Sequence, residues 1–326
     1  MITRILKWAL WFVLGIIALI LVSLGFVWLS VHWSEKDAAA DIAPKSGHFV
    51  KAADVNMYVQ EWGPADGPAI LFVHAAGGWS EAWRMTGEVL GKYGFHSIAA
   101  DMPPLGFSER PATPRYGRED QAKRLVGVLD ALHITRATVV GHSFGARAAA
   151  EMALVNPGRV SRLVLVDAAL SLQSGEEKPT FVSTLLGIGP VRNLITTVTL
   201  ANPLFTPRLL RLFVHNPASV TDYWVEIYRR PLSVKGSADA TADWLPELLT
   251  AKSSAKSADP AAYKQLAIPT LVLWGEEDSV TPLAQGKYIA SLIPNATLRT
   301  LPGVGHMPPI EDTKNFNAML LSFLQR

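Results

Sequence analysis

The chain has 326 residues, enough to bury a large core, and its 30 Lys and Arg against 28 Asp and Glu leave a net charge of +2. A balance this close to neutral, without a run of five like charges, argues against a nucleic-acid partner. The absence of cysteine excludes disulfides, thiolate metal sites and a cysteine nucleophile.

The N-terminal segment is long and apolar. Trp8–Val31 contains no ionisable residue, and as a helix it spans about 36 Å, against about 30 Å for the hydrocarbon core of a bilayer. Arg4 and Lys7 precede it, and basic residues stay on the cytoplasmic side. We therefore expect residues 1–33 to be an uncleaved membrane anchor with the rest of the chain outside the cytoplasm. The alternative is a signal peptide, whose removal leaves a secreted or periplasmic protein. Residues 34–46 are expected to be a linker.

From residue 47 onward, short apolar runs alternate with amphipathic helical stretches. This alternation is typical of a parallel sheet covered by helices on both faces. The runs predict strands within residues 48–63, 69–76, 96–101, 137–143, 162–169, 270–278 and 296–306.

One segment, residues 170–265, lacks a strand-like run and consists of apolar helical pieces interrupted by prolines. It is too long for a loop in a compact domain. We therefore expect a helical cap, inserted into a core made of residues 47–169 and 266–326. Its aromatic residues favour an apolar pocket: Phe205, Phe213, Tyr223, Trp224, Tyr228 and Trp244.

Ser143 stands in the run VVGHSFGA, between Gly141 and Gly145. An apolar strand precedes the serine and an alanine-rich, helix-forming stretch follows it. We therefore expect a sharp strand-to-helix turn, in which side chains at the two glycines would collide with their neighbours. A serine nucleophile needs a general base, and the base needs an acid that orients it. His306 and Asp278 each follow a predicted strand and are the candidates for these roles.

Five motifs in order resemble those of the α/β-hydrolase fold superfamily, in its serine-nucleophile branch with a helical cap: FVHAAGG, DMPPLGFSERP, GHSFGA, GEEDSVTP and GVGHMPPIE. The resemblance implies a mostly parallel eight-stranded sheet flanked by helices and a triad of Ser143, His306 and Asp278. Asp167 is the alternative acid, because some members place the acid after the sixth strand. The resemblance also implies an oxyanion hole formed by the backbone N–H groups of Ala76 and Phe144.

Two positions depart from the family pattern. Ala75 replaces a glycine of the oxyanion loop, which costs about 1–2 kcal/mol if the backbone there is left-handed. Pro104 replaces a glycine in a loop that we expect to be structural. His74 and His142 are expected to orient loops rather than to take part in the chemistry.

A serine nucleophile with this triad indicates acyl transfer to water. We expect hydrolysis of a carboxylic ester or lactone of a lipophilic small molecule, with the N-terminal helix in a membrane and without nucleic acid, cofactor or metal. Four alternatives stay open: a carbon–carbon bond hydrolase of vinylogous diketones, a haloperoxidase-like hydrolase, an acyltransferase on the same triad, and a catalytically inert binding member of the fold.

Overall fold

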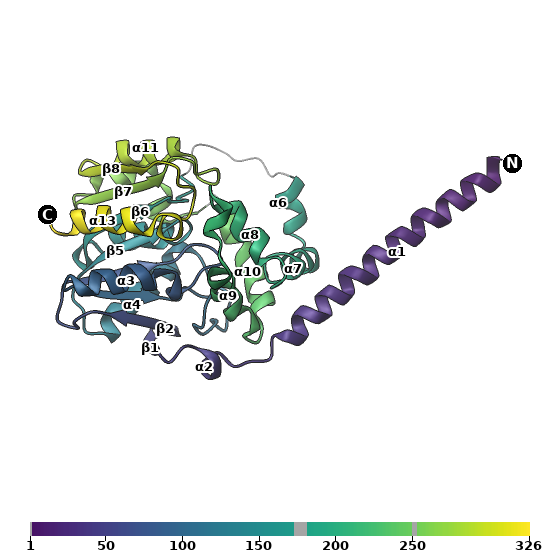
Figure 1. The fold of residues 1–326 in the computed structure, drawn as a ribbon, viewed down its shortest axis with the longest axis horizontal. Helices are drawn as coiled ribbons and strands as arrows, with labels where there is room; N and C mark the ends of the chain where they lie inside the picture. Colours follow the sequence, from purple (N-terminus) through teal and green to yellow (C-terminus); the bar gives the residue numbers. More distant parts are fainter. Residues whose placement is uncertain (1, 173–180, 250–252) are drawn as a thin grey trace.

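The computed structural model describes residues 2–172, 181–249 and 253–326. Eight strands form one sheet in the order β1-β2-β4-β3-β5-β6-β7-β8 (Figure 1). Strand β2 is antiparallel to both of its neighbours, β1 and β4, and the other neighbouring strands run parallel. The mostly parallel eight-stranded sheet predicted from the sequence is confirmed. The strands are β1 Gly47–Ala52, β2 Val55–Trp62, β3 Ala69–Val73, β4 His96–Ala100, β5 Ala137–His142, β6 Val160–Val166, β7 Thr270–Gly275 and β8 Ala296–Leu301.

Helices cover both faces of this sheet, and the alternation of side chains along β3 shows why. Ile70 and Phe72 pack in one buried cluster with α3 (Arg84–Lys92) and α13 (Thr313–Leu324). Leu71 and Val73 point the other way, into a cluster that includes residues of α4 (Arg118–Ala131), α5 (Gly145–Val155) and α11 (Leu283–Leu292). Strands buried on both faces have continuous apolar sequences, which is the pattern seen in the predicted strand runs.

The chain between β6 and β7 forms the expected helical insertion. Its described helices are α6 Phe181–Leu186, α7 Gly189–Val198, α8 Thr206–Phe213, α9 Asp222–Arg229 and α10 Ser237–Leu249. A buried cluster joins α8 and α9 to the core, with Trp224 and Tyr228 of α9 packed together with Trp79 and Phe107. The Trp79 indole N–H donates a hydrogen bond of 2.8 Å to the carbonyl of Ile227. The cap therefore rests on the core through a packed aromatic contact.

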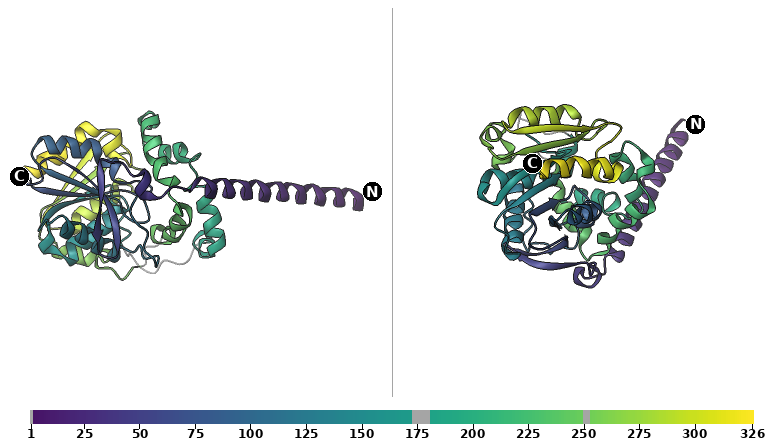
Figure 2. Two further views of the ribbon diagram at one scale, coloured as in Figure 1. Left: turned by 90° about the horizontal axis from the view of Figure 1, so that it is seen from below. Right: turned by 60° about the vertical axis from the view of Figure 1, so that its left-hand side comes forward.

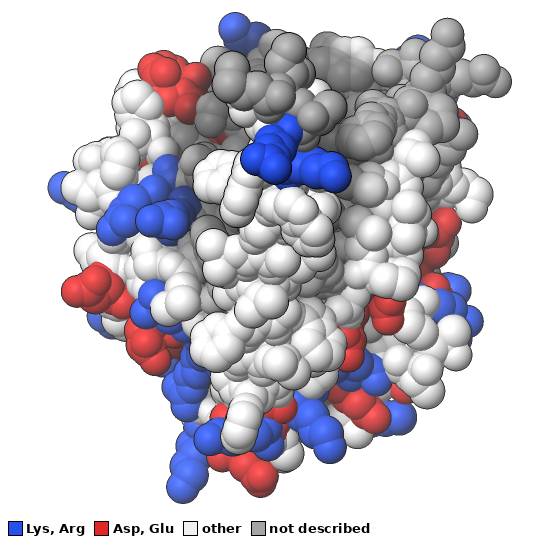
Figure 3. Space-filling view, turned by 90° about the vertical axis from the view of Figure 1, so that its right-hand side faces the viewer, with Lys and Arg blue, Asp and Glu red and all other residues white. Residues whose placement is uncertain are grey.

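Helix α1, Ile2–Ser34, projects from the rest of the molecule (Figures 1 and 2). Within Arg4–Ser34, an 18-residue window reaches a mean hydropathy of 2.8, and the helix is long and apolar enough to cross a membrane. Seen from the side toward which α1 points, uncharged side chains fill the centre, one group of basic side chains lies above them, and the other charged side chains lie mainly toward the edges (Figure 3). Signal sequences and anchors share these properties, so the helix fits both expectations.

The C-terminal end of α1 contacts the cap. The Val31 side chain is buried against Ala201 and Ala238, and the Trp28 indole donates a 3.0 Å hydrogen bond to Asn193 of α7. Just beyond the helix, the Glu35 carboxylate accepts a 2.6 Å hydrogen bond from the backbone N–H of Ala238, in the first turn of α10. The segment expected to be a linker therefore begins with a contact to the cap, and it also includes the short helix α2, Ala39–Ile42.

Candidate active site

Ser143 lies on the turn between β5 and α5 with a left-handed backbone, φ +51°. Such a conformation costs a non-glycine residue about 1–2 kcal/mol. A Cβ atom added to Gly145 would lie 2.3 Å from the backbone oxygen of His74, and one added to Gly141 would lie 2.6 Å from Cα of Ala146. Both contacts are too short and involve backbone atoms. The two glycines are therefore required because the strand, the turn and α5 meet at close range.

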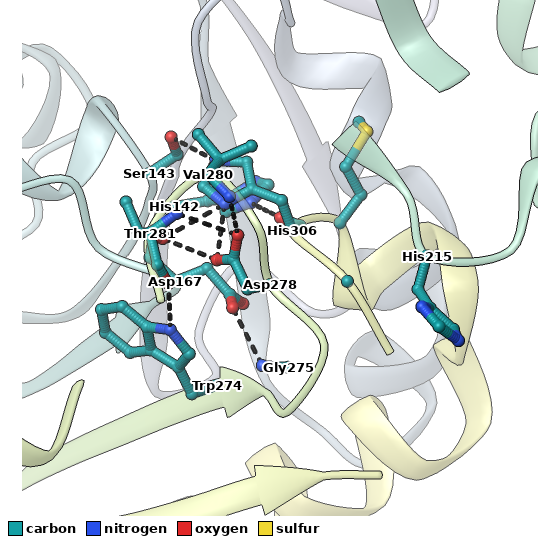
Figure 4. Close-up of polar contacts among 12 residues, drawn as sticks. His142, Ser143, Asp167, His215, Trp274, Gly275, Asp278, Val280, Thr281 and His306 are labelled. Carbon is teal, nitrogen blue, oxygen red and sulfur yellow. Dashed lines mark hydrogen bonds and ion pairs between the residues drawn. The ribbon is translucent and has the colours of Figure 1, made fainter. Parts of the chain in front are cut away.

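The structure brings Ser143, His306 and Asp278 together (Figure 4). Nε2 of His306 lies 2.7 Å from Oγ of Ser143, and Nδ1 of His306 lies 2.7 Å from Oδ2 of Asp278. The three residues are at most 6% exposed. One imidazole thus bridges the serine hydroxyl and the carboxylate, as proton transfer from serine to histidine requires.

Asp278 is held in place by its own turn. Oδ1 accepts hydrogen bonds from the backbone N–H groups of Val280 at 2.7 Å and Thr281 at 2.9 Å, and Oδ2 lies 2.6 Å from the Thr281 hydroxyl. Burial alone would raise the pKa of Asp278, but the hydrogen bond and charge of His306 and the Thr281 donors outweigh burial and lower it. Asp278 is therefore a carboxylate at neutral pH, fixed in orientation.

Asp167, the alternative acid, lies at the end of β6 and is fully buried. Its Oδ1 accepts a 2.9 Å hydrogen bond from the backbone N–H of Gly275. The ring of His306 is hydrogen bonded to Asp278 and not to Asp167. The geometry therefore favours Asp278 as the acid that orients His306.

The two neighbouring histidines hold loops. His74 contacts the carbonyl of Ala75 through Nδ1 and accepts the backbone N–H of Met102 on Nε2, both at 2.8 Å. Nε2 of His142 lies 2.7 Å from the carbonyl of His306. Burial lowers the pKa of His74 to about 4 and, together with the nearby His306, that of His142 to about 3. Both are neutral at pH 7, which suits them to positioning roles.

The candidate oxyanion donors are the backbone N–H groups of Ala76 and Phe144. Ala76 is in the loop after β3, and Phe144 directly follows Ser143. Within the described ranges, neither backbone N–H has a hydrogen-bond acceptor. Ala75 is not among the residues with positive φ, whereas Gly77 has φ +73°. The alanine at position 75 therefore carries none of the left-handed strain considered from the sequence.

Ser143 and His306 open into a cavity of about 140 Å³ between the core and the cap. Leu209, Leu210, Phe213, Tyr228, Trp244, Leu248 and Met307 supply much of its largely apolar wall. Arg110, Thr206, Ser237 and Thr241 are polar lining residues. Pro104 also lines the cavity, so its loop contributes to the pocket and is not only structural as expected.

Three further residues act on the site. Thr281 holds the Asp278 carboxylate through its backbone N–H and its hydroxyl group. In the sequence, only its position in the DSVTP run could have indicated this role. Arg110 belongs to the quoted motif DMPPLGFSERP, but no local pattern places it in the cavity. Glu311 ends the quoted motif GVGHMPPIE and accepts backbone N–H groups on both sides of His306, from Gly305 at 3.0 Å and Met307 at 3.1 Å. It therefore fixes the loop that carries the base.

Comparisons with known proteins agree with this architecture. A family model described as alpha/beta hydrolase fold matches residues 68–313. The 2-hydroxymuconate semialdehyde hydrolase of Pseudomonas sp. strain CF600 is 30% identical over 289 residues, which cover 86% of this chain and 95% of that protein. The solved structure of a meta-cleavage product hydrolase from Pseudomonas fluorescens IP01 is 27% identical, with a TM-score of 0.67, over 86% of this chain and 97% of that one.

A membrane phospholipase A has a similar fold, with a TM-score of 0.68 and 23% identity over 96% of this chain and 97% of that one. At that identity the similarity concerns the fold alone. The family model, in contrast, spans most of the chain, including Ser143, Asp278 and His306. The chain therefore belongs to the α/β-hydrolase fold family.

Proposed function

We propose that the protein is a serine hydrolase that cleaves a carboxylic ester of a lipophilic small molecule through an acyl-enzyme on Ser143. The observation that carries the proposal is the pair of 2.7 Å contacts from His306 to Ser143 and to Asp278, at the wall of a largely apolar cavity. The free energy falls when an apolar acyl chain moves from water to contact with such a wall.

The proposed mechanism transfers one proton in two directions. As Oγ of Ser143 attacks the ester carbonyl, Nε2 of His306 takes its proton, and Asp278 stabilises the imidazolium that forms. The negative oxygen of the tetrahedral intermediate faces the N–H groups of Ala76 and Phe144. His306 then gives the proton to the leaving alkoxide, and the alcohol departs. Water repeats the sequence on the acyl-enzyme and releases the acid.

A second candidate is hydrolysis of a carbon–carbon bond, and two observations favour it. The relative at 30% identity is named a 2-hydroxymuconate semialdehyde hydrolase. The cavity wall also includes Arg110, whose Nη2 donates 2.7 Å to Ser237 and whose buried Nε has no acceptor among the described residues. A substrate carboxylate would pair with this guanidinium, whereas a neutral ester would leave it unpaired.

The two candidates are separated by substrate. One experiment compares p-nitrophenyl esters of increasing chain length with a 2-hydroxy-6-oxo-dienoate, whose cleavage is followed by loss of its absorbance. We expect turnover of the esters, with kcat/KM rising over several carbons of chain length as the apolar wall is filled, and none with Ser143→Ala.

Faster cleavage of the dienoate would instead establish the second candidate, provided that Arg110→Met lowers kcat/KM for the dienoate and leaves kcat/KM for the esters unchanged. Turnover of neither class by a folded protein would contradict both.

The apolar helix α1 completes the proposal. We infer that it is a membrane anchor and that the catalytic domain lies outside the cytoplasm. The length and apolar character of the helix within Arg4–Ser34 support this. So does the order of charges, with Arg4 and Lys7 before the apolar run and the mostly acidic residues Glu35, Lys36, Asp37 and Asp41 after it. An anchor would keep the enzyme beside lipophilic substrates.

A further inference from the structure

A second buried carboxyl group, that of Asp167, lies directly behind the triad (Figure 4). The residue is 0% exposed and has a left-handed backbone, φ +41°. Its backbone N–H donates 3.0 Å to the carbonyl of Leu273, and its Oδ1 accepts 2.9 Å from the N–H of Gly275. Two contacts with β7 therefore fix both the backbone and the carboxyl group.

The other oxygen of this carboxyl group, Oδ2, is buried and accepts no hydrogen bond from any described residue. The polar group beside Asp167 is a second acceptor, the carboxyl group of Asp278. Asp167, Asp278 and His306 each place a polar atom within 4.8 Å of the others. A buried oxygen beside a carboxylate and without a donor is explained if that oxygen carries a proton itself.

The charges around Asp167 support the same protonation state. Burial raises the pKa of Asp167 well above its usual range, and the nearby Asp278 adds to the effect. Glu311 raises the pKa further, and the hydrogen bond from the Gly275 N–H lowers it. Asp278, in contrast, is ionised because His306 and Thr281 stabilise its charge. Two adjacent carboxyl groups with such different surroundings hold one negative charge and one proton.

We propose that Asp167 is a positioning residue that stays a neutral carboxylic acid: Oδ1 accepts the Gly275 N–H, and the protonated Oδ2 donates to Asp278. This role rests on the proposed serine hydrolase mechanism. The hydrogen bond from Asp167 restrains the Asp278 carboxylate on the side away from the pocket, and His306 binds the same carboxylate through Nδ1. It also limits the site to one negative charge, which is the charge that the imidazolium meets during turnover.

The matched pair Asp167→Asn and Asp167→Ala tests this role. The Asn amide reproduces the neutral acid, since its oxygen accepts from Gly275 and its NH₂ donates to Asp278. We expect kcat/KM within about threefold of wild type and an unchanged acid limb of the pH–rate profile. The Ala variant loses the donor, so kcat is expected to fall about ten- to a hundredfold with KM unchanged.

Two kinetic results would overturn the proposal. If Asp167 were ionised, Asp167→Asn would remove a negative charge beside His306 and move the acid limb down by about one pH unit or more. If Asp167→Ala retained wild-type kcat, the hydrogen bond would have no positioning role. Added EDTA is expected to change nothing, whereas inhibition that a divalent cation reverses would place a cation between the carboxyl groups.

Infrared spectroscopy tests the proton itself and needs neither turnover nor the Ala variant. The difference spectrum between wild type and Asp167→Asn at pH 7 is expected to contain the carbonyl stretch of one protonated carboxylic acid. A carboxylate band in its place would overturn the proposal, even if Ser143→Ala abolishes activity. Conversely, the acid band with an active Ser143→Ala variant would refute the proposed function and leave the protonation of Asp167 standing.

Discussion

Replacing Asp278 by asparagine is expected to reverse the hydrogen bonding of His306, the proposed general base. In the native site, Oδ1 of Asp278 accepts two backbone N–H groups, from Val280 and Thr281. These donors keep the amide oxygen of Asn at the Oδ1 position, because the amide NH₂ cannot accept a hydrogen bond. The NH₂ group then faces Nδ1 of His306 at the 2.7 Å contact. Nδ1 must then accept a hydrogen bond, so the ring proton moves to Nε2. There it points at Oγ of Ser143, and Nε2 can no longer accept the serine proton.

The magnitude follows from that tautomer. An imidazole with Nε2 protonated cannot take the proton of Ser143, and the charge that stabilised the imidazolium is also gone. The corresponding change in serine protease triads lowers kcat by about 10⁴. We therefore expect a loss of about 10³–10⁴-fold, equivalent to about 4–5.5 kcal/mol of transition-state stabilisation, while KM changes little.

Stopped-flow kinetics with a p-nitrophenyl ester measure this loss in the acylation step. Asp167→Asn is the matched control, since it makes the same change at an equally buried carboxyl group and is expected to retain activity. Urea unfolding of both variants shows whether the fold is kept. A loss below about tenfold in Asp278→Asn, with a larger loss in Asp167→Asn, would refute the reasoning and make Asp167 the acid that orients His306.

Three further predictions test the fold, the buried carboxyl group and the membrane segment. Gly145→Ala is expected to lower the free energy of unfolding by about 1–3 kcal/mol or more, because the new Cβ would lie 2.3 Å from the His74 carbonyl oxygen; wild-type stability in urea would contradict the packing argument. Asp167 has a raised pKa in the folded state, so it stabilises the fold below its unfolded pKa of about 3.9 and loses that contribution as pH rises toward the folded pKa. The free energy of unfolding of wild type, relative to that of Asp167→Asn, should therefore fall by about 1.4 kcal/mol per pH unit between the unfolded and the folded pKa, as measured by urea unfolding from pH 4 to 7. A difference that does not change with pH would mean that Asp167 has the same pKa in the folded and unfolded states. Full-length protein is expected to stay with membranes through a carbonate wash and to be digested by protease outside spheroplasts; a soluble product lacking residues 1–33 would identify a signal peptide instead.

The sequence was sufficient for the sheet and for the turn that carries the proposed nucleophile, because both leave local signals. β5 and β6 contain short apolar stretches, Val139-Val140 and Leu163–Val166, buried on both faces, and Ser143 lies between two glycines that a tight turn requires. The motif order also named His306 and Asp278 as candidates, and the structure places His306 2.7 Å from both Ser143 and Asp278. Local patterns were enough wherever one element or one turn determines the geometry.

The remaining features depend on contacts between distant segments, which no local pattern contains. The position of Arg110 in the cavity requires the packing of the cap against the core. The contact of Glu35 with α10 joins residues that are 203 positions apart. The choice between Asp278 and Asp167 depends on which carboxyl group reaches Nδ1 of His306, since both follow strands at the same edge of the sheet. Tertiary structure decides each of these.

Covalent labelling at Ser143 tests the central claim most directly. The protein is incubated with a fluorophosphonate, and the site of modification is identified by mass spectrometry of the digested chain, with Ser143→Ala as control. We predict a single adduct on Ser143 whose formation slows at acid pH as His306 becomes protonated, and none in the control. Equal labelling of Ser143→Ala, or an adduct elsewhere in a folded wild-type protein, would contradict the assignment of Ser143 as the nucleophile.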